Sequence, residues 1–301
     1  MWKKAISLFL GGVFVLSGIL KSVSLPDFEL YVFSFGILSF DLVSLAARLL
    51  VSFEIILGIG FLSGRCWKLV RTVCLAVLGF FSAFLLWRLA AGDSASCHCF
   101  GEIVDMSPAV SLAKNLLMMF LLGLVWRQED RPARPLAAVA VSVAVVVLIF
   151  VCSPPDAFIR GQRNPSDLDE ELFNRQLTIA GPGEGRKIVF LYSTSCEFCR
   201  KCAGKMSVVI KRHGIPSEDF FAIFMSTAAE EEMKSLVDNF FTQYGGGISI
   251  DYTLVQPLEF IPMTSGAMPI VAFVEDGRLV REFDSISISE DDIIDFLEQM
   301  R

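Results

Sequence analysis

The sequence predicts an α-helical membrane bundle, with four helices plus a fifth linking helix, followed by an α/β domain. Apolar residues make up 53% of the 301 residues and charged residues only 20%, whereas soluble domains are nearer one quarter charged. The composition changes near residue 152: residues 1–152 carry 12 basic and 9 acidic side chains, and residues 153–301 carry 14 and 24. A net charge of −7 also disfavours nucleic acid as a partner.

Five apolar stretches have the length, or nearly the length, of about 17–25 residues that a membrane-spanning helix needs. They are Ala5–Leu25, Leu42–Leu62, Leu69–Ala91, Pro108–Trp126 and Leu136–Cys152. The first follows Lys3 and Lys4 as a signal peptide would, but no small-residue cleavage site follows it, so a retained helix is favoured. The expected domains are a four-helix membrane domain at 1–130, a fifth helix at 131–152, a linker at 153–185 and the α/β domain at 186–301.

The distribution of basic residues predicts how the chain crosses the membrane. One set of connections carries Lys3, Lys4, Arg65, Lys68, Arg71, Arg127, Arg131 and Arg134. The loop Gly92–Ser107 has no lysine or arginine but contains three acidic residues. Because basic connections stay in the cytoplasm, we expect a multi-pass protein of the bacterial inner membrane with a cytoplasmic N-terminus and a periplasmic α/β domain. Cys97, Cys99, Cys196 and Cys199 would then share the compartment in which disulfides persist.

Polar side chains also lie in the outer halves of the predicted spans, where they are costly and often functional. They are Lys21, Arg48, Glu54, Arg88, Lys114 and Asn115. The long chains of Arg48 and Arg88 could snorkel to the membrane surface. Glu54 cannot do this well, and we expect Arg48 or Lys21 to pair with it. Basic residues near Cys97 and Cys99 would favour thiolates there.

Four motifs within residues 1–130 resemble the DoxX-like membrane proteins, and in particular the branch named for the methylamine utilisation protein MauE. They are Ser17-Gly18-Ile19-Leu20-Lys21, Phe53-Glu54, Cys97-His98-Cys99-Phe100-Gly101-Glu102 and Lys114-Asn115. The resemblance implies a four-helix membrane bundle associated with extracytoplasmic disulfide chemistry. Nothing in the sequence indicates methylamine metabolism, so only the redox association is carried over.

The second half alternates between strand and helix patterns. Residues 153–185 are rich in proline, glycine and polar side chains and are expected to form the linker, with one short helix near Asp167–Gln176. The predicted strands are Ile188–Tyr192, Phe220–Met225, Ile250–Val255, Pro269–Val274 and Leu279–Phe283, and the predicted helices run from Cys196 to about His213, over Ala228–Phe241 and over Ser289–Met300. Asp276-Gly277 favours a hairpin turn between the last two strands, and Ser289 is the expected N-cap of the last helix.

Cys196-Glu197-Phe198-Cys199 lies where the first strand turns into a helix, which is the thioredoxin-like redox signature. The first cysteine is at the helix N-terminus, where the dipole and free N–H groups stabilise a thiolate, and the second lies one turn on, within reach of a disulfide. Met268-Pro269 resembles the cis-proline loop of thioredoxin-like proteins, and its separation from Cys199 resembles the TlpA-like members. The resemblance implies that Pro269 faces the two cysteines.

Two features of this helix leave alternatives open. Cys202 extends the motif to Cys-x-x-Cys-x-x-Cys and could be a buried core residue, a third redox thiol or a metal ligand. Glu197 opposes a thiolate at Cys196, while Arg200, Lys201 and the helix N-terminus favour one, so the sequence alone leaves the balance undecided.

The leading hypothesis is a membrane-anchored, extracytoplasmic thiol–disulfide oxidoreductase that acts in disulfide formation, reduction or maturation of exported proteins. Cys196 would form the mixed disulfide, Cys199 would resolve it, Pro269 would shape the groove, and Cys97 and Cys99 would exchange with the soluble pair. Its partners would be exported disulfide-containing proteins, membrane lipid and a membrane electron donor or acceptor. Redox-active disulfides are the only redox groups that the sequence indicates. Whether a quinone takes part is left open, and no metal site is assigned.

Two other hypotheses remain. One is a copper or zinc trafficking module that uses the soft ligands of Cys97-His98-Cys99 and of the three cysteines at 196, 199 and 202. The other is a scaffold in which the cysteines are structural.

Overall fold

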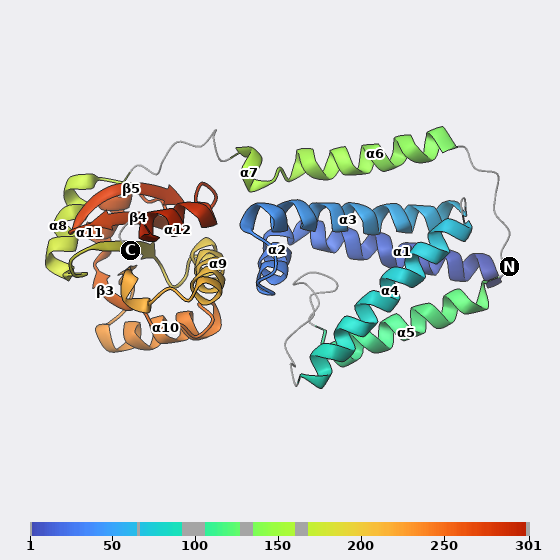
Figure 1. The fold of residues 1–301 in the computed structure, drawn as a ribbon, viewed down its shortest axis with the longest axis horizontal. Coiled ribbons are helices and arrows are strands. Elements are labelled where there is room, and N and C mark those ends of the chain that lie inside the picture. Colours follow the sequence, from blue (N-terminus) through green and yellow to red (C-terminus); the bar gives the residue numbers. More distant parts are fainter. Residues whose placement is uncertain (1, 65–66, 92–105, 127–134, 160–167, 299–301) are drawn as a thin grey trace. The chain divides into compact units, whose positions relative to one another are not determined.

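The computed structural model describes residues 2–64, 67–91, 106–126, 135–159 and 168–298 (Figure 1). Contacts divide the chain into two compact units: a helical one over residues 1–31 and 44–154, and an α/β one over residues 155–301 that also includes residues 32–43, the end of α2 (Leu25–Phe33) and the start of α3 (Phe40–Ser63).

The helical unit confirms that the five predicted spans are helices. Its elements are α1 (Trp2–Val23), α2 (Leu25–Phe33), α3 (Phe40–Ser63), α4 (Trp67–Ala90), α5 (Pro108–Leu124) and α6 (Pro135–Cys152). Helices α1, α3 and α4 are long and apolar enough to cross a membrane, and α5 and α6 are shorter apolar helices. The sequence did not predict α2, because its proline and two acidic residues are typical of a loop. Proline is nonetheless tolerated in the first turn of a helix, where Pro26 lies.

Helices α1 and α3 approach each other at glycine residues. A Cβ atom added to Gly58 would lie 2.8 Å from the carbonyl oxygen of Gly11, and one added to Gly11 would lie 2.9 Å from the carbonyl oxygen of Gly58. Nearby, the Ser7 hydroxyl donates a hydrogen bond of 2.7 Å to the carbonyl oxygen of Phe61. Small residues let membrane helices pack backbone to backbone, and the two helices are therefore in direct contact at this crossing.

The α/β unit is built on one mixed sheet of five strands. The strands are β1 (Arg186–Tyr192), β2 (Phe220–Met225), β3 (Asp251–Val255), β4 (Ile270–Glu275) and β5 (Arg278–Asp284), in the order β3-β2-β1-β4-β5. Strands β1, β2 and β3 are parallel, whereas β4 runs antiparallel to both β1 and β5. The predicted hairpin between β4 and β5 is present, with Asp276 and Gly277 at positive φ in its turn.

Helices cover both faces of this sheet (Figure 1). The strands alternate as a two-sided sheet requires: Ile188 and Phe190 enter one core, and Val189 and Leu191 enter the other. The first core includes side chains of α9 (Glu197–His213), α10 (Glu230–Gln243) and α12 (Glu290–Glu298). The second includes side chains of α8 (Glu170–Ala180) and α11 (Pro257–Thr264). The short elements α7 (Asp156–Ile159) and η2 (Ser217–Asp219) complete the unit.

Helix α8 lies within the range expected to be a linker, slightly later than the short helix predicted there. Asp169 caps it by accepting a hydrogen bond of 3.0 Å from the Leu172 N–H. Phe173 and Leu177 are fully buried against the sheet. The α/β unit therefore begins upstream of β1. The segment before β1 is polar overall, but its helix α8 is amphipathic and packs its apolar side on one face of the sheet.

Of two further helices in the α/β unit, the sequence predicted α12 and did not predict α11. Ser289 caps α12 as predicted, with its hydroxyl accepting a hydrogen bond of 3.1 Å from the Asp292 N–H. Helix α11 was not predicted, because Pro257 and Pro262 both favour loops. Pro257 is tolerated in the first turn, and burial of Phe260 and Met263 compensates for the proline in the interior.

Candidate functional site

Strand β1 and helix α9 position the two cysteines at the end of the sheet. The chain leaves β1 at Tyr192, and Cys196 is the N-cap of α9, with its sulfur accepting a hydrogen bond of 3.2 Å from the Cys199 N–H. The Cys196 side chain is partly exposed, whereas Cys199 is fully buried. Both are free thiols. One accessible and one buried sulfur, one helical turn apart, is the arrangement expected of a thiol–disulfide exchange pair.

The surroundings drive the pKa values of these thiols in opposite directions. Hydrogen bonding from the Cys199 thiol is the largest influence on Cys196 and lowers its pKa to about 6, with further help from two backbone N–H groups and from Arg200. Burial raises the pKa of Cys199 well above its ordinary value. At neutral pH Cys196 is therefore the thiolate and Cys199 the protonated partner.

The charges around Cys196 resolve the balance that the sequence left undecided. Lys201 pairs with Glu197 at 2.7 Å, which holds the pKa of Glu197 below its usual value and offsets its negative charge. Arg200 instead turns toward the loop before Cys196, where its Nε and Nη2 donate to the Thr194 carbonyl oxygen at 3.2 and 3.1 Å. Its guanidinium lies 5.0 Å from the ring centroid of Tyr244. The net effect of the neighbouring charges favours the thiolate.

Pro269 lies next to the same end of the sheet. The Met268–Pro269 bond is cis, and β4 begins at the following residue. Leu191 pairs with Ile270 in the antiparallel ladder, so the register brings Pro269 beside the last residue of β1. The structure thus brings Cys196, Cys199 and Pro269 to one end of the sheet.

The reactivity of Cys196 should follow its lowered pKa. We expect its rate of alkylation by iodoacetamide to rise with pH with a midpoint near 6, compared with 9.0 for an ordinary thiol. Because its pKa is lower in the folded protein than in the unfolded chain, the reduced protein should gain stability as pH rises from about 6 to 9.0, and this gain should vanish below 6.

Two variants that each remove one positive charge provide the control. Arg200→Gln should move the alkylation midpoint upward, whereas Lys201→Gln should move it less, because Arg200 and not Lys201 is among the main causes that lower the pKa of Cys196. An alkylation midpoint near 9 in the parent protein would contradict the assignment of Cys196 as the thiolate.

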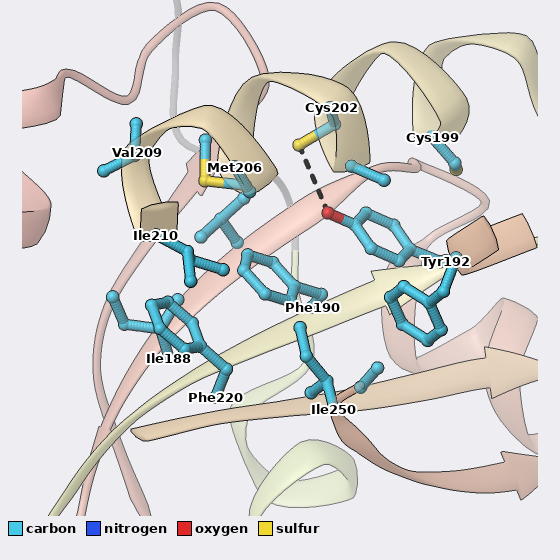
Figure 2. Close-up of a cluster of buried hydrophobic side chains, with 14 of the residues drawn as sticks. Ile188, Phe190, Tyr192, Cys199, Cys202, Met206, Val209, Ile210, Phe220 and Ile250 are labelled. Atoms are coloured by element: carbon cyan, nitrogen blue, oxygen red, sulfur yellow. Dashed lines mark hydrogen bonds between the residues drawn. The ribbon is translucent and has the colours of Figure 1, made fainter. Parts of the chain in front are cut away.

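Cys202 lies in the core on the same side of α9 as Cys199. It is fully buried, and its sulfur accepts a hydrogen bond of 3.5 Å from the Tyr192 hydroxyl (Figure 2). Burial is the main cause that raises its pKa to about 11. Within the described residues, no group of three or more histidine, cysteine or acidic side chains is arranged to hold a metal ion. The predicted metal ligands in the loop, Cys97, His98 and Cys99, lie outside the described residues. The predicted exchange between Cys97 or Cys99 and Cys196 therefore stays a prediction.

The polar residues predicted inside the helical unit are paired there. Of the two partners expected for Glu54, the structure shows Lys21, with Nζ to Oε1 at 2.5 Å, and Ser17 donates to the other carboxylate oxygen at 3.1 Å. Arg48 instead forms an ion pair with Glu29. Arg48 also donates to the carbonyl oxygens of Ser44, Ser153 and Pro154.

Neither predicted snorkelling arginine is exposed, since Arg48 and Arg88 each keep only 4% of their surface. Arg88 donates to the Tyr31 hydroxyl at 3.1 Å, Asn115 is buried and Lys114 is half-buried. The sequence did not single out Glu29 or Tyr31 as partners, because both were assigned to a loop rather than to α2. The sequence did contain a signal for one of these pairs: Glu29 is an acidic residue close to a predicted span that contains Arg48.

Comparisons with known proteins agree with both parts of the chain. The family described as methylamine utilisation protein MauE matches residues 2–128. Protein TlpB of Flavobacterium psychrophilum is 21% identical over 351 aligned positions, which cover 97% of this chain and 93% of that protein. None of the solved structures matches. The chain therefore joins a MauE-like membrane domain to an α/β domain with a thioredoxin-like fold, and it is similar to Protein TlpB along nearly its whole length.

Proposed function

We propose that this protein is a membrane-anchored thiol–disulfide oxidoreductase. The observation that carries the proposal is the Cys196–Cys199 pair. Cys196 is partly exposed, its pKa is lowered to about 6, and its sulfur accepts a hydrogen bond from the backbone N–H of Cys199, whose own thiol is fully buried. A thiolate at neutral pH is the nucleophile of disulfide exchange, and a buried neighbouring thiol is suited to resolve the product.

The reaction follows from these two positions. The Cys196 thiolate attacks a disulfide of the partner, forming a mixed disulfide and releasing one partner sulfur as a thiolate. Cys199 then loses its proton and attacks the Cys196 sulfur, so that the Cys196–Cys199 disulfide forms and the second partner sulfur leaves. The partner is reduced by two electrons and the protein is oxidised by two; the reverse sequence introduces a disulfide.

The substrates and compartment belong to the same proposal. Membrane helices in the N-terminal part support a membrane protein, and the basic connections favour a periplasmic α/β domain that acts on exported proteins with disulfides. A membrane electron donor or acceptor would complete the cycle, with Cys97 and Cys99 as the proposed relay.

A redox titration of the full chain tests the function. Purified in detergent and equilibrated with mixtures of reduced and oxidised glutathione, the protein should form the Cys196–Cys199 disulfide in one two-electron step. Alkylation followed by mass spectrometry of the peptide that contains both residues would measure this, with Cys152→Ser as a control for exposed thiols outside the pair. Failure of the pair to oxidise in any mixture, together with stoichiometric copper or zinc in the reduced protein, would contradict the proposal and favour the metal-binding alternative.

A further inference from the structure

The interior of the helical unit changes from apolar to polar along its length. The apolar part is a cluster to which α1, α3, α4 and α5 all contribute, and its outermost members on these helices are Phe14, Leu57, Leu78 and Met118. One turn further out, each of the four helices places a polar side chain on the same face, three or four residues away. We call these side chains the polar layer: Ser17, Glu54, Ser82 and Asn115.

The packing of α4 and α5 brings two members of the polar layer to one level. The helices lie side by side and run in opposite directions (Figure 1). At the far end of the apolar cluster, the Arg71 guanidinium donates to the Trp126 carbonyl oxygen at 2.5 Å. Ser82 lies eleven residues after Arg71, and Asn115 lies eleven residues before Trp126. With a rise of about 1.5 Å per residue on both helices, Ser82 and Asn115 are therefore at the same height.

The half of the polar layer on α1 and α3 satisfies its own hydrogen bonds and charges. The Ser17 hydroxyl donates to one carboxylate oxygen of Glu54 at 3.1 Å, which joins the two helices at this level. Lys21, one turn further along α1, pairs with the other oxygen at 2.5 Å. The two charges of this half thus offset each other, so the polar layer does not call for a charged ligand.

The half on α4 and α5 has unsatisfied groups. The hydroxyls of Ser82 and Ser111 are buried and have no hydrogen-bond partner among the residues that the structure describes. Ser111 lies one turn from Asn115 on the same face of α5, and the Asn115 side chain, which can both donate and accept, is buried as well. Buried polar groups without a partner are costly and rare in native proteins. Two such hydroxyls beside a buried amide indicate that a ligand supplies the partner.

The surroundings define the chemistry of that ligand. The polar layer lies between helices of the membrane domain, which favours a lipid-soluble molecule, and the balanced charges of Lys21 and Glu54 favour a neutral head group. Hydroxyl and amide groups can donate to an oxygen and can also accept from one. A quinone fits each requirement: it is neutral and lipid-soluble, its two oxygens accept hydrogen bonds, and the same oxygens donate them in the quinol.

We propose that Ser82, Ser111 and Asn115 bind the head group of a membrane quinone. The inference rests on the proposed function, which needs a membrane electron donor or acceptor, and it names the chemical class of that carrier. The electron balance closes, because oxidation of the Cys196–Cys199 dithiol to a disulfide releases two electrons and two protons, and reduction of a quinone to a quinol takes up the same number.

Photolabelling of the full chain in detergent tests the site. A short-chain quinone with an azide on its ring is bound, illuminated, and located by digestion and mass spectrometry. The label should saturate and should map to peptides of α4 and α5 that contain Ser82 or Ser111. An excess of decylubiquinone should displace it, whereas decylbenzene, which has the same alkyl chain but lacks the ring oxygens, should not.

Variants separate binding from packing through effects of opposite sign. Ser82→Ala and Ser111→Ala should each raise the quinone concentration for half-saturation about threefold to tenfold, the effect of one hydrogen bond of ordinary net strength. Each should leave the quinone-free protein as stable as the parent or more stable, because a buried hydroxyl without a partner is removed. Ser7→Ala is the matched control: it removes a buried hydroxyl that donates to Phe61 at 2.7 Å, and it should lower stability without changing the labelling.

Contrary results are equally defined. A label that does not saturate, that maps away from α4 and α5, or that decylbenzene displaces as well would overturn the inference. Unchanged half-saturation in both serine variants would also overturn it. The glutathione titration of Cys196 and Cys199 uses no quinone, so normal oxidation of that pair without specific labelling would overturn this inference alone. Failure of the pair to oxidise would overturn the proposed function instead.

Discussion

Replacing Cys196 with serine should abolish disulfide exchange, whereas replacing Cys199 with serine should leave the protein trapped on its partners. The expected loss for Cys196→Ser is at least about a thousandfold in rate, because a serine hydroxyl is not ionised at neutral pH and cannot take the place of a thiolate. Cys199→Ser keeps the partly exposed thiol at residue 196 and removes only the buried sulfur that resolves the mixed disulfide.

The two variants can be compared in membranes from cells that express each full chain. Alkylation at harvest and non-reducing electrophoresis should show reducible adducts with Cys199→Ser and none with Cys196→Ser. Cys152→Ser, which removes an exposed thiol at the end of α6, should behave as the parent does. Adducts that accumulate instead through Cys199 in the Cys196→Ser variant would reverse the assigned roles.

Breaking the Lys21–Glu54 pair should strongly destabilise the helical unit. Glu54→Ala leaves the Lys21 ammonium buried without its carboxylate, and Lys21→Ala does the converse, so each single change should cost about 3–5 kcal/mol of unfolding free energy. The double change Lys21→Met with Glu54→Leu should recover most of this loss, because two apolar side chains of similar size remove the desolvation penalty along with the attraction.

Unfolding in mixed micelles with increasing sodium dodecyl sulfate, followed by circular dichroism, would measure these changes. Glu230→Gln is the surface control: it breaks an exposed pair with Lys234 on α10 and should cost less than about 1 kcal/mol. The double variant could instead prove as unstable as the less stable single variant. The loss of stability would then come from lost side-chain packing and not from the broken ion pair.

The parts of this fold that the sequence predicted depend on local pattern. Long apolar runs identified the helices of the membrane part, and the alternation from Ile188 to Tyr192, the Asp276-Gly277 turn and the Ser289 cap identified elements of the α/β unit. Cys196 and Cys199 were identified because a Cys-x-x-Cys at a strand-to-helix turn places both sulfurs by local geometry alone. None of these inferences needs knowledge of which distant segments meet.

The parts that the sequence did not predict depend on contacts between distant residues. The choice of Lys21 rather than Arg48 as the partner of Glu54 is made by the packing of α1 on α3, and the choice of Glu29 for Arg48 by the presence of α2. Tyr192 was predicted only as the last residue of a strand. Its hydroxyl reaches Cys202 because the sheet face beneath α9 places the two together, which no spacing along the chain reveals.

The packing of α8 determines where this protein can be divided into fragments. A fragment that begins at β1 would lack Phe173 and Leu177, which cover Val189, Leu191 and Ile223 on one face of the sheet. It would also lose the Asn174 side chain, whose oxygen accepts a hydrogen bond of 2.9 Å from the Leu279 N–H. An uncovered apolar face of this kind promotes self-association. A fragment that keeps Cys196 and Cys199 on this covered sheet face therefore has to start no later than Leu168, which packs on the same core one residue before Asp169, the N-cap of α8.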